Sequence, residues 1–146
     1  MRPFFMHRFE EITLTLLRVV AGLMFMQHGA QKLLGALGGV DGQGGTPPAF
    51  SMFWFAGVLE LVGGLLVALG LFTRPVAFLL SGQMAVAYFM VHAPNSFWPI
   101  LNQGELAALY CFVFLYFSAR GPGRYSLDHA VFGRRADTPA PGPARV

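Results

Sequence analysis

Ionisable residues interrupt the apolar stretches of this 146-residue chain. Arg18, His28 and Lys32 lie in the first stretch, and Glu60 lies in the second. A charge near the centre of a bilayer costs about 2.5–3.5 kcal/mol, so charged side chains in such segments normally face protein or trapped water. A histidine and a carboxylate can together exchange protons with a bound molecule. We therefore expect Glu60 and His28 to handle protons, with Arg18 holding Glu60 ionised.

Further polar residues accompany this pair in the remaining apolar stretches. His92 ends the third stretch, and Asn102 and Glu105 lie where the fourth begins. At 1.5 Å per residue, His28, His92 and Glu105 come to similar depths of roughly 21–24 Å. We expect a pocket open toward the outer face, with a small organic ligand bound in it. The predicted binding residues are Arg18, Lys32, His92, Asn102 and Glu105.

These residue types allow three kinds of ligand. Two histidines and two glutamates on four helices could bind a metal, but no Glu-x-x-His spacing occurs. His28 and His92 could ligate a haem, although the bulky Tyr88 and the lack of a second histidine pair disfavour it. A quinone head group needs a histidine and a carboxylate to hydrogen-bond its oxygens, and it fits these residues best. We therefore expect no metal site and take a quinone as the candidate cofactor.

Composition places these residues in a membrane protein. Hydrophobic residues make up 55% of the sequence and charged residues only 12%, which is more apolar surface than a soluble fold of this size can bury. The net charge of +3 comes from arginines near the chain ends, which membrane-flanking loops explain better than nucleic-acid binding does. The single cysteine, Cys111, excludes an intrachain disulfide and any Cys-x-x-Cys redox mechanism.

The apolar stretches predict an all-α fold, an integral membrane four-helix bundle within residues 1–132. A helix needs about 20 residues to cross a bilayer. The predicted spans are at about residues 12–34, 51–72, 76–92 and 105–119. Most arginines fall on one side of this arrangement, so the positive-inside rule puts both termini in the cytoplasm. The proline- and arginine-rich tail, residues 133–146, is predicted to be disordered.

Small residues share helix faces with the ionisable ones, and such faces should point into the bundle because small residues let helices approach closely. In the first two spans these faces carry Gly22 and Gly29, and Gly57 and Gly64. In the fourth span, the face predicted to point inward carries Glu105, Ala108, Leu109, Phe112 and Tyr116.

Five short motifs together resemble those of the DoxX family of small four-helix bacterial membrane proteins. They are His28-Gly-Ala-Gln-Lys32, Gly57-Val-Leu-Glu60-Leu-Val-Gly63-Gly64, Gly70-Leu-Phe-Thr73-Arg74, Asn102-Gln-Gly104-Glu105 and Gly121-Pro-Gly123-Arg-Tyr-Ser126-Leu127-Asp128. The resemblance covers roughly Leu17 to Asp128. It implies a multi-pass protein of the bacterial inner (plasma) membrane. Relatives in this family are linked to quinone-reducing sulfur oxidation and to membrane-associated oxidoreductase complexes involved in redox stress.

Two hypotheses of function follow. In the first, the protein is a membrane subunit of a quinone-linked redox system, with a polar intramembrane pocket and a soluble or membrane oxidoreductase as partner. In the second, it is a non-enzymatic scaffold or a carrier of a small solute or lipid. Glu60 and Arg18 would then form an ion pair that only fixes helix register. Both hypotheses place the chain in the lipid bilayer, and neither involves nucleic acid.

Overall fold

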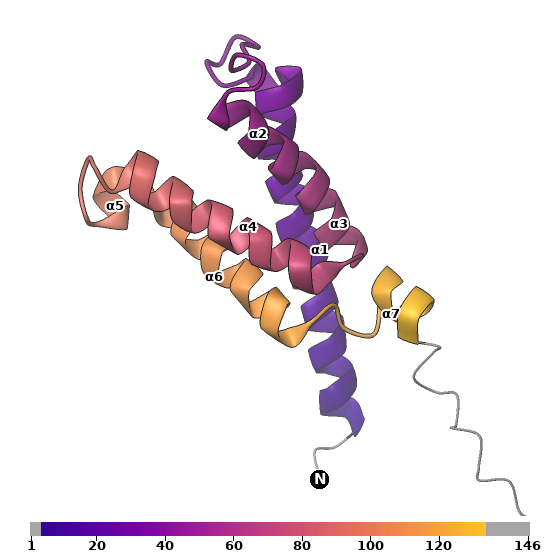
Figure 1. Cartoon of the computed structure of the whole chain (residues 1–146). Helices are drawn as coiled ribbons and strands as arrows, with labels where there is room; N and C mark the ends of the chain where they lie inside the picture. The colour runs from indigo at the N-terminus through magenta and orange to yellow at the C-terminus, as the bar shows by residue number, and fades with distance from the viewer. Residues whose placement is uncertain (1–3, 134–146) are drawn as a thin grey trace, which may run out of the picture.

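Helices make up most of residues 4–133, the part of the chain that this computed structural model describes (Figure 1). They are α1 (Phe4–Leu34), α2 (Met52–Val58), α3 (Gly64–Leu69), α4 (Thr73–Ala87), α5 (Pro99–Asn102), α6 (Glu105–Arg120) and α7 (Leu127–Phe132). The described residues form no strand, so the all-α prediction is confirmed there. The predicted disordered tail lies outside the described residues, apart from Gly133.

Three short turns complete the helical elements. A 3-10 turn, η1 (Ala36–Gly38), follows α1. The π-helical turn η2 (Leu59–Gly63) joins α2 to α3, and one continuous helix therefore runs from Met52 to Leu69. A second π-helical turn, η3 (Tyr88–His92), extends α4.

The long helices form two antiparallel pairs that diverge from one end of the molecule (Figure 1). One pair is α1 packed along α2, η2 and α3, and the other is α4 packed along α6. The pairs meet near the turn between α3 and α4, which we call the closed end. They lie apart at the end that carries η1 and α5, which we call the open end. The crossing of a membrane by four helices stays a prediction.

Glycines bring the backbones of the first pair into direct contact. A Cβ atom at Gly22 would lie 2.6 Å from the carbonyl oxygen of Gly64, and one at Gly29 would lie 2.8 Å from that of Gly57. Real Cβ atoms do not approach backbone this closely, so only glycine permits this helix spacing. The prediction that these small-residue faces point toward a neighbouring helix is therefore confirmed.

The buried core lies where the two pairs meet. The ring of Phe25 from α1 packs against that of Phe114 from α6, with centroids 4.8 Å apart. Tyr110 stacks on Phe114 at 5.5 Å, and the side chain of Leu80 from α4 is fully buried beside them. Aromatic rings in such tilted and stacked arrangements contribute beyond the apolar area they bury.

The inward face predicted for the fourth stretch is wrong. Leu109, Phe112 and Tyr116 are exposed. The residues that α6 buries are Ala107, Tyr110, Phe114 and Phe117. This helix is apolar on nearly every face, so its periodicity carries little contrast, and packing against α4 and α1 decides which side is buried.

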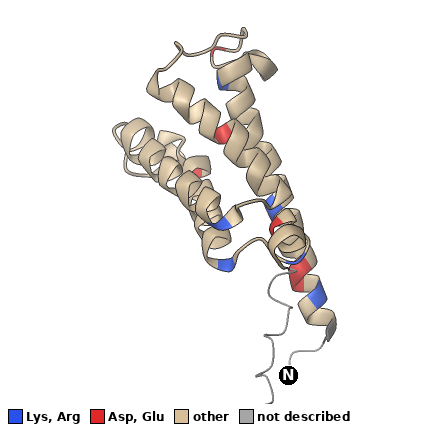
Figure 2. Cartoon of the chain, turned by 45° about the vertical axis from the view of Figure 1, so that its right-hand side comes forward, with Lys and Arg blue, Asp and Glu red and all other residues tan. Residues whose placement is uncertain are grey.

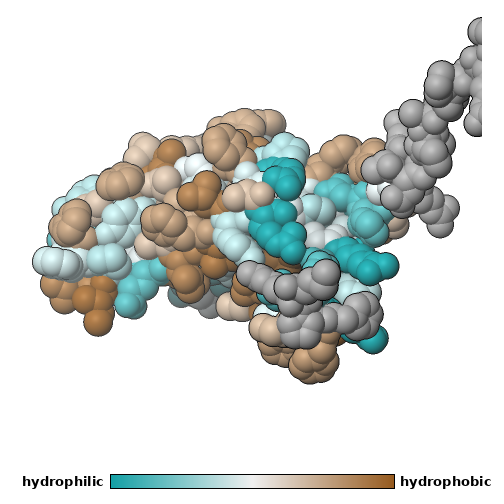
Figure 3. All heavy atoms as spheres, turned by 90° about the horizontal axis from the view of Figure 1, so that it is seen from below, coloured by the Kyte–Doolittle hydropathy of each residue, from teal (hydrophilic) through white to brown (hydrophobic). Residues whose placement is uncertain are grey.

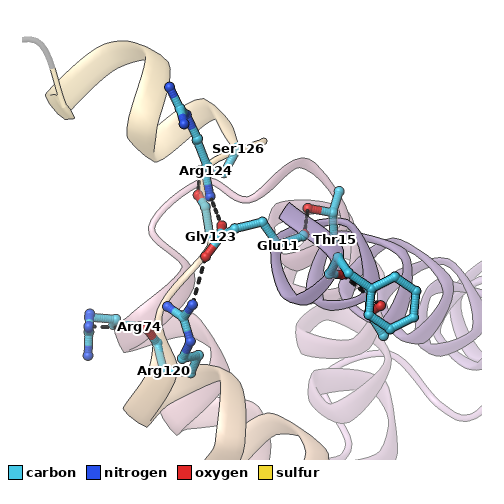
Figure 4. A network of polar contacts seen from close by, with 9 residues as sticks. Glu11, Thr15, Arg74, Arg120, Gly123, Arg124 and Ser126 are labelled. Carbon is cyan, nitrogen blue, oxygen red and sulfur yellow. Dashed lines mark hydrogen bonds and ion pairs between the residues drawn. The ribbon is translucent and has the colours of Figure 1, made fainter. Parts of the chain in front are cut away.

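Charged and capping groups tie the closed end together (Figure 4). The carboxylate of Glu11 accepts hydrogen bonds from the backbone N–H of Arg124, at 2.6 Å, and from the guanidinium of Arg120, at 2.7 Å. The Arg124 N–H above all, and then Arg120, hold the pKa of Glu11 below its ordinary value. The carboxylate of Asp128 accepts from the N–H groups of Phe72 and Thr73, at the start of α4. The two Asp128 bonds fix α7 beside the turn between α3 and α4 (Figure 1).

The sides of the molecule are apolar and the closed end is charged. Phe78, Phe89 and Phe112 are among many large apolar side chains that are exposed. Most charged residues gather toward the end that carries the N-terminus (Figure 2). Seen from that end, hydrophilic residues form a cluster with hydrophobic residues around it (Figure 3). Within the described part, Met52–Leu69 and Thr73–His92 are long and apolar enough to cross a membrane.

Candidate functional site

An ion pair between a buried carboxylate and a partly exposed ammonium joins α1 to η2 in the first helix pair. Glu60 lies in η2 and its side chain is only 3% exposed. The ammonium group of Lys32, near the end of α1, donates to both carboxylate oxygens of Glu60, at 2.6 and 2.5 Å. The side-chain amide of Gln83, from α4, donates to the same carboxylate at 3.1 Å. We call these three residues the Lys32–Glu60–Gln83 cluster.

Arg18 does not contact Glu60, and the prediction that it holds Glu60 ionised is wrong. Its guanidinium is buried at the closed end and donates to the carbonyl oxygens of Val67, Ala68 and Tyr125, at 2.7–2.9 Å. Val67 and Ala68 lie in the last turn of α3, where backbone carbonyls carry partial negative charge. The Val67 carbonyl also accepts a hydrogen bond from the Gly70 N–H at 3.0 Å. These acceptors are within reach of Arg18, whereas Glu60 is two helical turns further along.

A large cavity of about 750 Å³ lies between α2 with η2 and α4 with η3. Apart from the Lys32–Glu60–Gln83 cluster, the described residues that line it are apolar, including Phe53, Leu79 and Met90. Gly82 belongs to its wall, and a Cβ atom there would meet nothing within 4 Å. The large cavity is thus an apolar space, open on one side, with one group of polar side chains, which is the usual make-up of a small-molecule site.

A small cavity of about 350 Å³ lies on another side of the same ion pair. Lys32 and Glu60 line both cavities. The small cavity also has His28 from α1, His92 from η3 and Tyr110 from α6 in its wall. The structure therefore brings His28, Lys32, Glu60 and His92 around one space, and these are four of the seven predicted site residues.

Two predicted site residues have other surroundings. Asn102 is buried and holds the loop before α6 in place: its side chain donates to the Ser96 carbonyl at 2.6 Å and accepts from the Gly104 N–H at 2.7 Å. The backbone carbonyl oxygen of Asn102 lies 3.0 Å from Nδ1 of His92, and this contact positions the His92 ring. Glu105 is in the first turn of α6 and lines a separate surface hollow together with Gln103.

Both π-helical turns of the described helices carry an ionisable residue of these cavities. Glu60 lies in η2 and His92 in η3. A π turn adds a residue to the helical turn, and such turns occur frequently at functional sites. In the second span, Glu60 is buried together with Gly57 and Gly64, the small residues with which counting 100° per residue groups it.

Sequence reasoning missed Gln83 and Tyr110. Gln83 is the one amide within the third apolar stretch, and that isolation is the signal that could have indicated it. Tyr110 carries no such signal, because it lies among aromatic and apolar residues of α6. As for metals, residues 4–133 hold no group of three or more histidine, cysteine or carboxylate side chains suited to binding an ion.

Comparisons with known proteins found one family model and several relatives. The DoxX family model matches residues 13–93, a range that contains the whole Lys32–Glu60–Gln83 cluster. A Haemophilus influenzae relative named "Uncharacterized protein" is 44% identical, covering 87% of this chain and 96% of the relative. "Putative oxidoreductase CatD" of Bacillus subtilis is 30% identical, covering 87% and 92%. A Mycobacterium tuberculosis relative, described as an uncharacterized membrane protein, is 32% identical, covering 81% and 80%. No solved structure matches the chain.

Proposed function

Because the chain belongs to the DoxX family and is a membrane protein, we propose that it is a membrane subunit of a quinone-linked redox system. The observation that carries the proposal is the Lys32–Glu60–Gln83 cluster in the wall of the large, otherwise apolar cavity. The name of the Bacillus subtilis relative, which describes an oxidoreductase, supports a redox role.

The shape and chemistry of the large cavity suit a quinone. A quinone combines a flat ring bearing two carbonyl oxygens with an apolar tail, and cavities of about 300–1,000 Å³ are typical for ligands of that size. Phe53, Leu79 and Met90 would contact the ring and the first part of the tail. The ammonium of Lys32 and the amide of Gln83 can donate to carbonyl oxygens, once they turn from Glu60 toward the ligand.

Proton handling falls to Glu60, with Lys32 rather than Arg18 as its counter-ion. Reduction of a quinone to a quinol takes up two electrons and two protons. The electrons would come from a partner oxidoreductase, and Glu60 would pass protons one at a time to the quinone oxygens. His28, in the wall of the small cavity next to Glu60, would return protons to that carboxylate.

We also propose the arrangement in the membrane. Four helical segments, within the predicted spans, would cross the bacterial inner membrane, with both termini in the cytoplasm. The closed end carries Arg74, Arg120 and Arg124 (Figure 4), which the positive-inside rule places on the cytoplasmic side. The open end, with Trp54 and Trp98, would then lie at the outer interface.

Extraction of bound quinone from the purified protein tests the proposal. The protein is incubated with ubiquinone and menaquinone in lipid nanodiscs, washed, extracted and analysed by mass spectrometry. We expect stoichiometric quinone in the natural protein and at least a tenfold loss in Glu60→Gln and in Gly82→Leu, which fills the large cavity. Ala119→Leu adds the same side chain at an exposed position of α6 outside the cavities and should retain quinone.

Two results would count against the proposal. Equal amounts of bound quinone in all four proteins, or no bound quinone in the natural protein, would show that the large cavity is not a quinone site. Lower abundance of Glu60→Gln with unchanged quinone per molecule would favour the scaffold or carrier hypothesis, in which the ion pair only stabilises the fold.

A further inference from the structure

The small cavity holds a buried polar group that the fold leaves without a partner. Tyr110 is 6% exposed, and its hydroxyl has no hydrogen-bond partner among the described residues. A buried hydroxyl without a hydrogen bond costs about 1–3 kcal/mol, so such groups normally bond to protein or to water. Tyr110 lines the small cavity, but its hydroxyl is enclosed in the structure, so the ring must move slightly before water in the cavity can supply the missing bond.

The other polar groups of this cavity are spaced around its wall. The titratable groups that line it are His28 and Lys32 from α1, Glu60 from η2, His92 from η3 and Tyr110 from α6. A cavity holds water when it has room and offers each molecule two to four polar partners. At about 30 Å³ for each water, the 350 Å³ volume has room for on the order of ten.

Three hollows follow one another through the molecule. The surface hollow beside Glu105 shares Gln103 and Leu106 with the small cavity. The small cavity shares Lys32 and Glu60 with the large cavity. Glu60 therefore lines both cavities, and the small cavity, whose wall is mostly apolar with five titratable groups in it, adjoins the surface hollow beside α5.

We propose that the small cavity is a water-filled proton path from the Glu105 hollow to Glu60. A proton leaves a hydronium ion in the surface hollow, passes along hydrogen-bonded waters held by His92, His28 and Tyr110, and binds the Glu60 carboxylate. Each step breaks one O–H or N–H bond and forms another, and no electron moves. The fate of the proton beyond Glu60 rests on the proposed quinone site, whereas the hydration of the cavity does not.

Thiol accessibility tests the hydration directly. In a Cys111→Ser background, Ala107→Cys places a thiol in the wall of the small cavity, and Ala77→Cys places one in the core outside both cavities. Both alanines are buried, at 7% and 0% exposure. A membrane-impermeant methanethiosulfonate should modify Ala107→Cys at least about tenfold faster, because only a hydrated thiol forms the reactive thiolate. Equal, slow rates would show that the cavity is dry and overturn the proposal.

Infrared spectroscopy then tests proton delivery without any quinone. After a rapid drop in pH, the carboxylic C=O band that is missing in Glu60→Gln reports protonation of Glu60. Tyr110→Phe should slow this band at least threefold, while Tyr116→Phe, at an exposed position of the same helix, should not. Equal rates in these two variants would refute the role of Tyr110. If the thiol and infrared results are as expected but the protein binds no quinone, the proposed function is wrong and the proton path still stands.

Discussion

Arg18 gives the sharpest test of the structure, because the sequence predicts a ligand-binding residue and the structure gives it a structural role. Its side chain is 1% exposed and makes three hydrogen bonds of 2.7–2.9 Å to backbone carbonyls. Hydrogen bonds from a charged donor contribute about 1.5–3 kcal/mol each. The carbonyls of Ala68 and Tyr125 would lose this donor, whereas the Val67 carbonyl would keep its bond from the Gly70 N–H. Part of this gain offsets the cost of burying the guanidinium. We expect Arg18→Met to lower the free energy of unfolding by about 3–5 kcal/mol.

The assay is denaturant unfolding in mixed micelles, followed by circular dichroism. Arg18→Lys keeps the charge but loses the fork that reaches Val67 and Tyr125 together, so it should recover only part of the stability. Arg8→Met, at an exposed position of α1, is the matched control and should change stability by less than about 0.5 kcal/mol. A stable Arg18→Met protein that has lost bound quinone would refute this reasoning and return Arg18 to the binding site.

Two further predictions concern helix contact and pH. Gly29→Ala should destabilise the protein by about 1–3 kcal/mol, because its Cβ would meet the rigid Gly57 carbonyl, while Gly82→Ala, with open space around it, should be neutral or stabilising; unfolding titrations compare the two. The lowered pKa of Glu11 means that its contribution to stability is complete above about pH 4.3 and is lost as pH falls through the folded-state pKa. The stability difference between the natural protein and Glu11→Gln should therefore shrink toward zero in acid, and a difference that grows there would contradict this sign.

Local sequence decided the elements and the close helix contact. The predicted second span ends near residue 72 and the fourth begins near residue 105, and in the structure α3 ends at Leu69 and α6 begins at Glu105. Gly22 and Gly29 are spaced by two helical turns, as are Gly57 and Gly64, so each pair lies along one face. Both features depend on residues near one another in the chain, and for that reason they are readable from it.

The sequence also indicated which ionisable residues would share a space, but not which would bond. His28, Lys32, Glu60 and His92 line one cavity, whereas Glu105, predicted at the same depth as His28 and His92, lines a separate surface hollow. Depth along a helix says nothing about rotation or about competing acceptors. For Arg18 the nearer acceptors were backbone carbonyls at the end of α3, and backbone groups are invisible to a search for opposite charges.

Composition and periodicity by themselves determined that this chain is helical and belongs in a membrane, because a bilayer can cover apolar surface of this extent and a soluble fold of this size cannot bury it. Tertiary structure alone decided that Lys32 is the partner of Glu60, that Tyr110 is part of the wall of the small cavity, and that the large cavity lies between the two helix pairs. Those outcomes depend on the rotation of each helix, on the π-helical turns η2 and η3, and on packing of a nearly uniform α6 against its neighbours. Each is a contact between distant segments, and no local pattern encodes it.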